Sequence, residues 1–249
     1  MGKRAIEVRL NLKITGVVAM VLMLFAGFSC SRGSEKVNAS DPAVDEVRTE
    51  QADGKVKADA RETGDNQKQE ERTAVLAGGC FWCTEGVFQN VEGVKDVVSG
   101  YAGGTEKTAN YADVTSGRTD HAEAIKITYD PQKITYGQLL KIFFTVAHDP
   151  TTLNRQGNDV GRQYRSAIFY ENEKQKEIAE KYIQQLEDER AFGKKKIVTT
   201  IEPLEGFYPA EDYHQDYIWN NPNVPYVRFQ ALPKVEKLKK TYPEILKQD

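Results

Sequence analysis

The sequence predicts an α+β fold for residues 73–249, and two observations predict it. Short apolar runs bounded by turn residues have the length and composition of strands. Between them lie stretches in which apolar residues recur every three or four positions, as on one face of a helix. This alternation predicts two βαβ-like units that form a two-layer sandwich, with the helices packed largely on one face of a mixed sheet.

The first unit is predicted between residues 73 and 101. Residues 73–77 form its first strand, and Gly78 and Gly79 allow a sharp turn with positive φ. Residues 94–101 form its second strand. A helix is predicted between the strands because apolar residues follow the turn at helical spacing, namely Phe81, Val87, Phe88 and Val91.

The second unit is predicted between residues 121 and 170. Its strands are residues 121–129 and residues 164–170. Thr135 can cap the helix between them, and Pro150 ends it. The apolar face of this helix consists of Leu139, Leu140, Phe143, Phe144 and Ala147.

A third helix is predicted to start at Asn172 and to close near Gly193. Residues 196–203 form the last predicted strand. The order of all these elements predicts a ferredoxin-like arrangement of the sheet and its helices.

The first 30 residues have the pattern of an export signal. Basic residues precede an apolar stretch at positions 14–28, which has the length of a signal-peptide core and is short for a membrane span. The run then leads to Cys30, as in a bacterial lipoprotein signal, where this cysteine is lipidated. We therefore predict a protein anchored by lipid to a bacterial membrane, on its periplasmic or outer surface. Plain secretion and an uncleaved anchor are the alternatives, since Phe28 stands where a small residue is usual.

Residues 31–72 are predicted to be a disordered tether. They contain no aromatic residue, no Leu and no Ile, and they are dense in charges of both signs. Such a segment cannot bury enough apolar surface to offset its ordering entropy. As a flexible coil it would span about 35 Å. The net charge of −3 and the lack of a basic stripe argue against nucleic-acid binding.

Cys80 and Cys83 predict redox or nucleophilic chemistry, in a chain with one other cysteine. Unpaired N–H groups at a helix start favour a thiolate, which predicts a lowered pKa at Cys80. Cys83 lies one helical turn later and could close a disulfide with Cys80. A buried structural cysteine and a zinc site are the alternatives, but no second ligand pair occurs at metal-binding spacing.

Several motifs occur in the order found in one known family. They lie at residues 78–83, 100–104, 121–124, 148–151, 156–159, 163–166 and 211–215. With them the chain resembles peptide methionine sulfoxide reductase A over most of residues 73–229, which would make residues 73–249 the catalytic domain. The resemblance implies reduction of the S epimer of methionine sulfoxide, free or in proteins, and thus repair of oxidised proteins.

Strand alternation supports an acid role for Glu123. It shares a strand face with Ile125, Ile127 and Tyr129. Desolvation on that face would raise its pKa and keep the carboxyl group protonated, so that it can protonate a departing sulfoxide oxygen. The alternative is a carboxylate at a frayed strand end that faces water. The resemblance implies the acid role.

The resemblance also implies roles for further residues. Cys80 would be the nucleophile, the hydroxyl groups of Tyr111 and Tyr164 would hold the sulfoxide oxygen, and Asp159 would organise the pocket and its water. Taken without their flanking motifs, the tyrosines are typical core residues and Asp159 a typical loop cap.

Aromatic residues are expected to bind the substrate's S-methyl group. A methyl next to a partly positive sulfur is well accommodated on aromatic faces, which suits Phe81 and Trp82. Asp212 and Tyr213 are further candidates for lining the same pocket.

Cys83 is the candidate for the resolving cysteine. Many family members keep that cysteine in a C-terminal tail, whereas no cysteine follows Cys83 in this chain. The expected cycle forms a sulfenic acid on Cys80 and then a disulfide, which a thioredoxin-like dithiol protein reduces. No phosphate-binding glycine motif occurs, so no cofactor is expected, and neither a metal nor an obligate oligomer is predicted. His148 and His214 are expected to make structural hydrogen bonds.

Two other function classes remain open from the sequence. A thioredoxin-like thiol-disulfide exchanger also has two cysteines at a helix start, but a small or Pro-containing spacer would be expected between them in place of Phe81 and Trp82. A surface lipoprotein that binds a partner without catalysis is the other class.

Overall fold

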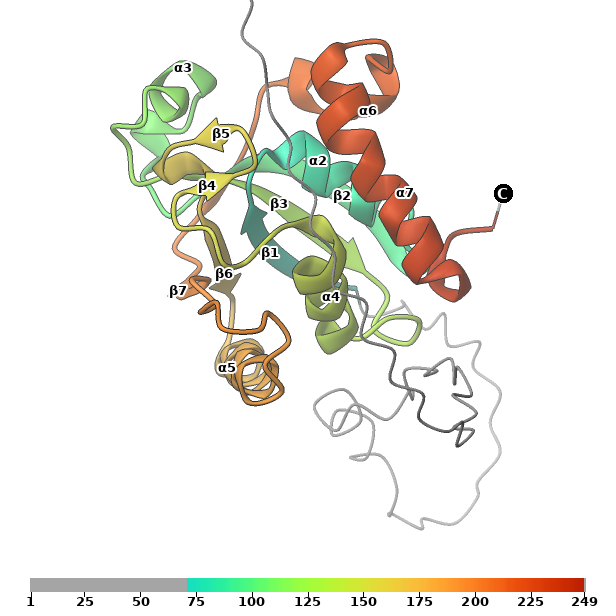
Figure 1. Ribbon diagram of the computed structural model, residues 1–249. Helices are drawn as coiled ribbons and strands as arrows, with labels where there is room; N and C mark the ends of the chain where they lie inside the picture. Colours follow the sequence, from blue (N-terminus) through green and yellow to red (C-terminus); the bar gives the residue numbers. More distant parts are fainter. Residues whose placement is uncertain (1–70, 249) are drawn as a thin grey trace, which may run out of the picture. The chain divides into compact units, whose positions relative to one another are not determined.

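A single six-stranded sheet organises residues 71–248, the part of the chain that the computed structural model describes (Figure 1). Its strand order is β7-β6-β1-β3-β2-β8. Neighbouring strands are antiparallel except β6 and β7, which run parallel. The sheet is therefore mixed and the fold is α+β, as predicted. The predicted signal segment and almost all of the predicted tether lie outside the described residues.

The strands of the sheet are β1 (Arg72–Gly78), β2 (Val94–Ala102), β3 (Ala122–Tyr129), β6 (Ser166–Tyr170), β7 (Thr200–Pro203) and β8 (Phe207–Pro209). A separate hairpin pairs β4 (Arg155–Gln156) with β5 (Asp159–Val160). The α-helices are α2 (Phe81–Phe88), α3 (Tyr111–Thr115), α4 (Tyr136–Ile142), α5 (Glu173–Asp188), α6 (Tyr217–Asn220) and α7 (Leu232–Thr241).

The two predicted βαβ units are β1-α2-β2 and β3-α4-β6. Their helices bury apolar residues against one face of the sheet, in a large cluster to which α5 and α7 also contribute. The opposite face is built from small residues such as Ala77, Ala124 and Ala167, with Leu204 and Phe207 packed against them. The helices therefore lie largely on one face of the sheet, as expected.

Local signals account for the helix starts. The hydroxyl of Thr135 accepts from the Gln138 N–H, and the Gln138 side chain accepts in return from the Thr135 N–H, which forms a capping box. The side chain of Asn172 accepts from the Gln175 N–H and caps α5. After α4 the chain continues as a π-helical turn to Ala147 rather than as regular α-helix.

Two of the sequence predictions are wrong, and several elements were not predicted. β6 begins at Ser166 because residues 162–164 form a 3-10 turn. Residues 196–203 do not contain the last strand, since β8 follows and pairs with the edge strand β2. The β4-β5 hairpin was not predicted, because each of its strands has only two residues.

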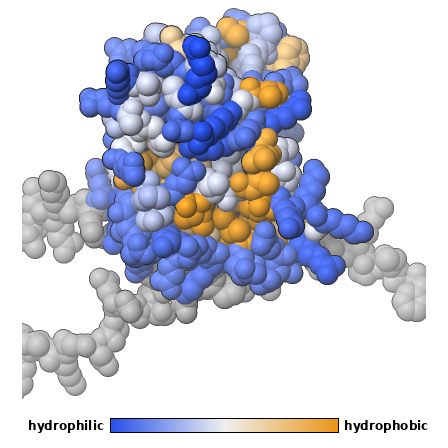
Figure 2. Space-filling model, turned by 90° about the vertical axis from the view of Figure 1, so that its left-hand side faces the viewer, coloured by the Kyte–Doolittle hydropathy of each residue, from blue (hydrophilic) through white to orange (hydrophobic). Residues whose placement is uncertain are grey.

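The described surface is mostly hydrophilic on the side shown in Figure 2, where hydrophobic residues gather mainly in one area in the lower half, with smaller patches above it. Within residues 71–248, no helix combines the length and apolar character that a membrane span requires.

Candidate active site

Cys80 lies at the junction between β1 and α2. Gly79 makes the turn with a φ of 88°, and a Cβ at this position would collide with the side chain of Gln156. Cys80 is the residue immediately before the first turn of α2, and its carbonyl accepts from the Cys83 N–H at 3.1 Å. The turn and the helix that follow β1 are thus as predicted.

Cys80 and Cys83 are buried free thiols that share a side-chain hydrogen bond. The hydrogen bond from Cys80 lowers the pKa of Cys83 to about 7, although burial opposes this, and Lys234 adds to the effect. Burial, the bond with Cys83 and the charges of Cys83 and Glu123 raise the pKa of Cys80. The two sulfurs therefore lose their first proton as a pair.

The prediction of a lowered pKa at Cys80 is wrong for this geometry. The sulfur of Cys80 makes no capping hydrogen bond to α2. The Phe81 N–H at the start of the helix instead donates to Oε2 of Glu123, at 3.1 Å. Desolvation therefore dominates at Cys80, and Cys83 is the thiol whose ionised form is stabilised.

Glu123 is a buried carboxyl group beside the nucleophile candidate. It lies on β3 with 2% of its surface exposed, on the strand face that Ile125 and Ile127 share. Burial raises its pKa to about 8, and the Phe81 N–H only partly offsets this. The predicted burial and raised pKa are thus present, and the carboxyl group is protonated at neutral pH.

Tyr111 and Tyr164 lie near the same two groups. After burial, the charges of Glu123 and Cys80 are the largest causes that raise the pKa of each hydroxyl. Both tyrosines therefore stay protonated at neutral pH and can act as hydrogen-bond donors.

Tyr226 is a member of the site that the sequence analysis missed. Its hydroxyl donates to Oδ2 of Asp159 at 2.6 Å and lies 3.9 Å from the Cys83 sulfur. Asp159 therefore orients a tyrosine beside the second thiol. The family motif at residues 156–159 pointed to Asp159, but Tyr226 had no sequence motif that distinguished it from the other tyrosines.

Trp82 is held in place by two neighbours from the C-terminal part of the chain. Its Nε1 donates to Nδ1 of His214 at 3.2 Å, so that Nε2 of His214 carries the proton. The Trp82 ring stacks on Tyr217 with centroids 3.8 Å apart. Phe81 is buried, and its ring centroid lies 5.1 Å from that of His214. His214 thus has the structural role expected, with Trp82 as its partner.

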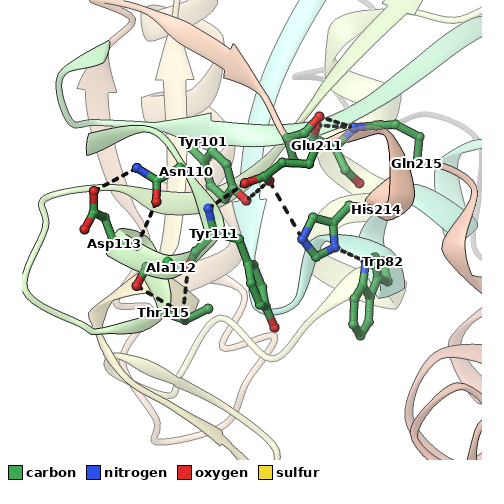
Figure 3. A network of polar contacts seen from close by, with 12 residues as sticks. Trp82, Tyr101, Asn110, Tyr111, Ala112, Asp113, Thr115, Glu211, His214 and Gln215 are labelled. Carbon is green, nitrogen blue, oxygen red and sulfur yellow. Dashed lines mark hydrogen bonds and ion pairs between the residues drawn. The ribbon is translucent and has the colours of Figure 1, made fainter. Parts of the chain in front are cut away.

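Glu211 connects the first residue of α3 to β2 (Figure 3). Its two carboxylate oxygens accept from the Tyr111 N–H and from the Tyr101 hydroxyl, each at 2.9 Å. Burial opposes ionisation, but these hydrogen bonds lower the pKa of Glu211. In Figure 3 the rings of Tyr111 and Trp82 extend in the same direction, with His214 between them. Glu211 therefore positions Tyr111, a role that the sequence analysis did not assign.

Two other residues that the sequence singled out, His148 and Tyr213, differ in burial. His148 is buried, and its ring bonds to the Phe143 carbonyl and the Ser166 hydroxyl, so it is structural. Burial lowers its pKa to about 3. Tyr213 is exposed but contacts the His214 ring at 4.1 Å. Among residues 71–248 no group of three or more His, Cys, Asp or Glu side chains could hold a metal ion. Cys30 lies outside this part of the chain.

The arrangement combines a nucleophile, an acid and neutral donors within one buried site. A thiol pair that loses a proton near neutral pH can attack an electrophilic atom, and a protonated carboxyl group can deliver a proton to the leaving oxygen. Two tyrosine hydroxyls can hold that oxygen, while the flanking rings suit an apolar substituent.

Comparisons with known proteins agree with this chemistry. The family model described as "Peptide methionine sulfoxide reductase" matches residues 72–246. A Synechocystis protein named peptide methionine sulfoxide reductase MsrA 2 is 58% identical over 70% of this chain and 81% of its own length. A Mesorhizobium japonicum protein of the same name is 56% identical over 70% of this chain and 88% of its own length.

Two solved structures are similar in fold. Reduced Mxr1 from Saccharomyces cerevisiae has a TM-score of 0.55 and 38% identity, over 61% of this chain and 87% of its own. Methionine sulfoxide reductase A of Corynebacterium diphtheriae has a TM-score of 0.55 and 37% identity, over 63% of this chain and 77% of its own.

Replacing Cys80 should raise the pKa of Cys83. In Cys80→Ala the hydrogen bond that most lowers this pKa is lost while the burial remains, so the pKa should rise from about 7 toward and beyond that of an ordinary thiol. The pH dependence of alkylation by iodoacetamide, followed by mass spectrometry of the Cys83 peptide, measures it. Tyr226→Phe should give a smaller rise. An unchanged midpoint in Cys80→Ala would contradict the pairing.

Proposed function

The chain belongs to the peptide methionine sulfoxide reductase family, and from this premise we propose that it reduces the S epimer of methionine sulfoxide with Cys80 as nucleophile and Glu123 as acid. It is an oxidoreductase that reduces methionine sulfoxide, in the A branch of the family. Free and protein-bound substrates are proposed, with repair of oxidised proteins as the result. The observation that carries the proposal is the buried Glu123 carboxyl group, hydrogen-bonded at the helix start beside Cys80.

In the first proposed step the Cys80 sulfur attacks the sulfoxide sulfur. Cys83, as the thiolate of the pair, takes the Cys80 proton through their shared hydrogen bond. Glu123 gives its proton to the sulfoxide oxygen as the bond between this oxygen and the substrate sulfur breaks. The attack forms a bond between the Cys80 sulfur and the substrate sulfur. This bond breaks as the protonated oxygen moves to Cys80 as a hydroxyl group, and its electron pair stays on the substrate sulfur. The substrate sulfur gains two electrons, Cys80 loses two, and methionine leaves a sulfenic acid on Cys80.

Neighbouring groups assist that step. Tyr111 and Tyr164 donate hydrogen bonds to the sulfoxide oxygen as negative charge develops on it. Trp82 and Phe81 contact the S-methyl group, whose partial positive charge suits aromatic faces. Asp159, through Tyr226, orients a hydroxyl beside Cys83.

In the second proposed step Cys83 resolves the sulfenic acid. Its sulfur attacks Cys80, the S–O bond breaks, and the hydroxyl group leaves as water with the Cys83 proton. A thioredoxin-like dithiol then reduces the disulfide by exchange, which restores both thiols. The electrons therefore come from an external dithiol, and the proposal needs no bound cofactor.

We also propose the finer structural and cellular assignments. The central order β6-β1-β3-β2, with antiparallel neighbours and two helical crossovers, supports a ferredoxin-like description. A monomer is proposed for the catalytic domain. The N-terminal pattern supports export and lipid anchoring at Cys30, with residues 31–72 as a tether to the catalytic domain at residues 73–249.

Wild-type protein should consume only the S epimer of racemic methionine sulfoxide when dithiothreitol is the reductant. Cys80→Ser should be inactive, and Glu123→Gln should lower kcat/KM by about 10²-fold to 10⁴-fold because it lacks the transferable proton. The wild-type rate should fall as pH rises through the Glu123 pKa of about 8, since the acid is then ionised. Glu106→Gln, at an exposed carboxylate, is the control. Consumption of the R epimer, or activity in Cys80→Ser, contradicts the proposal.

One turnover without reductant should leave a disulfide between Cys80 and Cys83. Mass spectrometry should find the peptide that contains both residues lighter by two hydrogen atoms. In Cys83→Ser the reaction should stop at a sulfenic acid that a dimedone probe traps. If the wild type also accumulates the trapped sulfenic acid, Cys83 is not the resolving cysteine.

Lipidation should depend on Cys30. Bacterial cells that express the full chain and grow with an alkynyl fatty acid should incorporate the label into the wild type and retain it with membranes. Cys30→Ala should lack the label and appear in the soluble fraction. An unlabelled wild-type protein, or a labelled Cys30→Ala, would refute lipid anchoring at this residue.

A further inference from the structure

One stripe of the catalytic helix α2 faces the segment that contains α6. Its residues lie at positions i, i+3, i+4 and i+7, which form one helix face, and they are Trp82, Glu85, Gly86 and Gln89. A Cβ at Gly86 would lie 2.1 Å from Cδ1 of the buried Ile218, so the two helices are in close contact there. The stripe begins at Trp82, an aromatic residue of the active site.

Glu85 is a buried carboxyl group that the proposed chemistry does not use. It is 1% exposed, and its Oε1 accepts from the Asp216 N–H at 3.1 Å. Oε2 is buried and has no hydrogen-bond partner at normal distance and angle among the described residues. The nearby Ser99 hydroxyl nevertheless lowers the pKa of Glu85 slightly, against the effect of burial. Burial raises its pKa to about 7, and the charges of Asp216 and Asp96 add to this. Burying a carboxyl group costs free energy unless it is hydrogen-bonded, so its presence here indicates a specific positional role.

Asp216 is the partner that Glu85 fixes. It has a φ of 54°, in the left-handed region that non-glycine residues rarely adopt, and it directly precedes α6. Gln89 donates to its Oδ1 at 2.6 Å. Glu85 of α2 and Gln89, the residue that follows the helix, therefore fix the unfavourable backbone conformation of Asp216. Glu85 accepts from its N–H, and Gln89 donates to its side chain.

The fixed turn orients the two residues that hold Trp82. Tyr217 follows Asp216 and stacks on the Trp82 ring at 3.8 Å with an interplanar angle of 9°. His214 precedes Asp216 by two residues and accepts from Trp82 Nε1. A change in the turn would therefore move both contacts of the indole ring.

We propose that Glu85 is a positioning residue for sulfoxide binding, which fixes the Asp216 turn and thereby the orientation of Trp82 through Tyr217 and His214. This inference rests on the proposed function, because Trp82 is proposed to contact the substrate's S-methyl group. Glu85 acts through its hydrogen bond to the backbone, so an amide side chain can replace it.

The test measures substrate binding and the Trp82 environment together. Glu85→Ala should raise KM for methionine S-sulfoxide about tenfold, as expected for a lost hydrogen bond to a buried N–H, while kcat changes by less than about threefold. The chain has two tryptophans, and a Trp219→Phe background leaves Trp82 as the sole fluorophore. Because Trp219 donates to the Gln89 side chain, KM and emission of each variant are compared with those of Trp219→Phe itself. Acrylamide should quench the Trp82 fluorescence more strongly in Glu85→Ala, because the indole ring becomes more accessible. Glu85→Gln should restore both KM and emission.

A matched control separates positioning from loss of stability. Gln175→Ala removes a buried side chain that donates to the Thr73 carbonyl, at the end of β1 remote from Cys80. It should lower Tm without changing KM or Trp82 emission. If Glu85→Ala lowers Tm but leaves KM and the Trp82 emission unchanged, the proposal is overturned.

A second variant covers the case in which Glu85→Ala does not fold. Gln89→Ala removes the half-buried side chain that donates to Asp216. It should raise KM about twofold to threefold and shift the Trp82 emission in the same direction as Glu85→Ala. No shift in Gln89→Ala would then overturn the proposal. If the wild type shows no sulfoxide reduction, the proposed function fails, while the fluorescence measurements still test whether Glu85 positions Trp82.

Discussion

The hydrogen bond from the Phe81 N–H to the Glu123 carboxyl group is the interaction on which the site depends. It joins the first N–H of α2 to a residue of β3, and so it brings the acid next to Cys80. The bond is possible because β1 and β3 are neighbours in the sheet and α2 packs on the face to which Glu123 points. The fold thus brings a nucleophile and an acid together although 42 positions separate the bonded residues.

The same burial sets the protonation states that the chemistry needs. The pKa of Cys83 is about 7 and that of Glu123 is about 8. Near neutral pH a substantial share of the thiol pair has therefore lost one proton, while most of the carboxyl group keeps its own. A base and an acid therefore coexist near neutral pH, because a hydrogen bond stabilises one negative charge and desolvation prevents the other.

The sequence predicted what local patterns determine. The glycine turn and the apolar spacing located Cys80 before a helix, and strand alternation located Glu123 on a buried face. Contacts between distant segments had no such signal. Glu211 meets Tyr111 across 100 positions and His214 meets Trp82 across 132, so neither pair could be inferred from spacing. The pKa of Cys80 was mispredicted for the same reason, since the helix start is local but the burial and the competing carboxyl group come from elsewhere.

Measuring the protonation state of Glu123 tests directly whether this residue can act as the acid. Infrared difference spectroscopy between wild type and Glu123→Gln isolates the carbonyl stretch of this one carboxyl group. If Glu123 is the acid, a protonated-carboxyl band should be present at neutral pH and should disappear as the pH rises past about 8. A carboxylate signal at neutral pH, with no such band, would mean that Glu123 cannot supply the proton and would contradict the central claim.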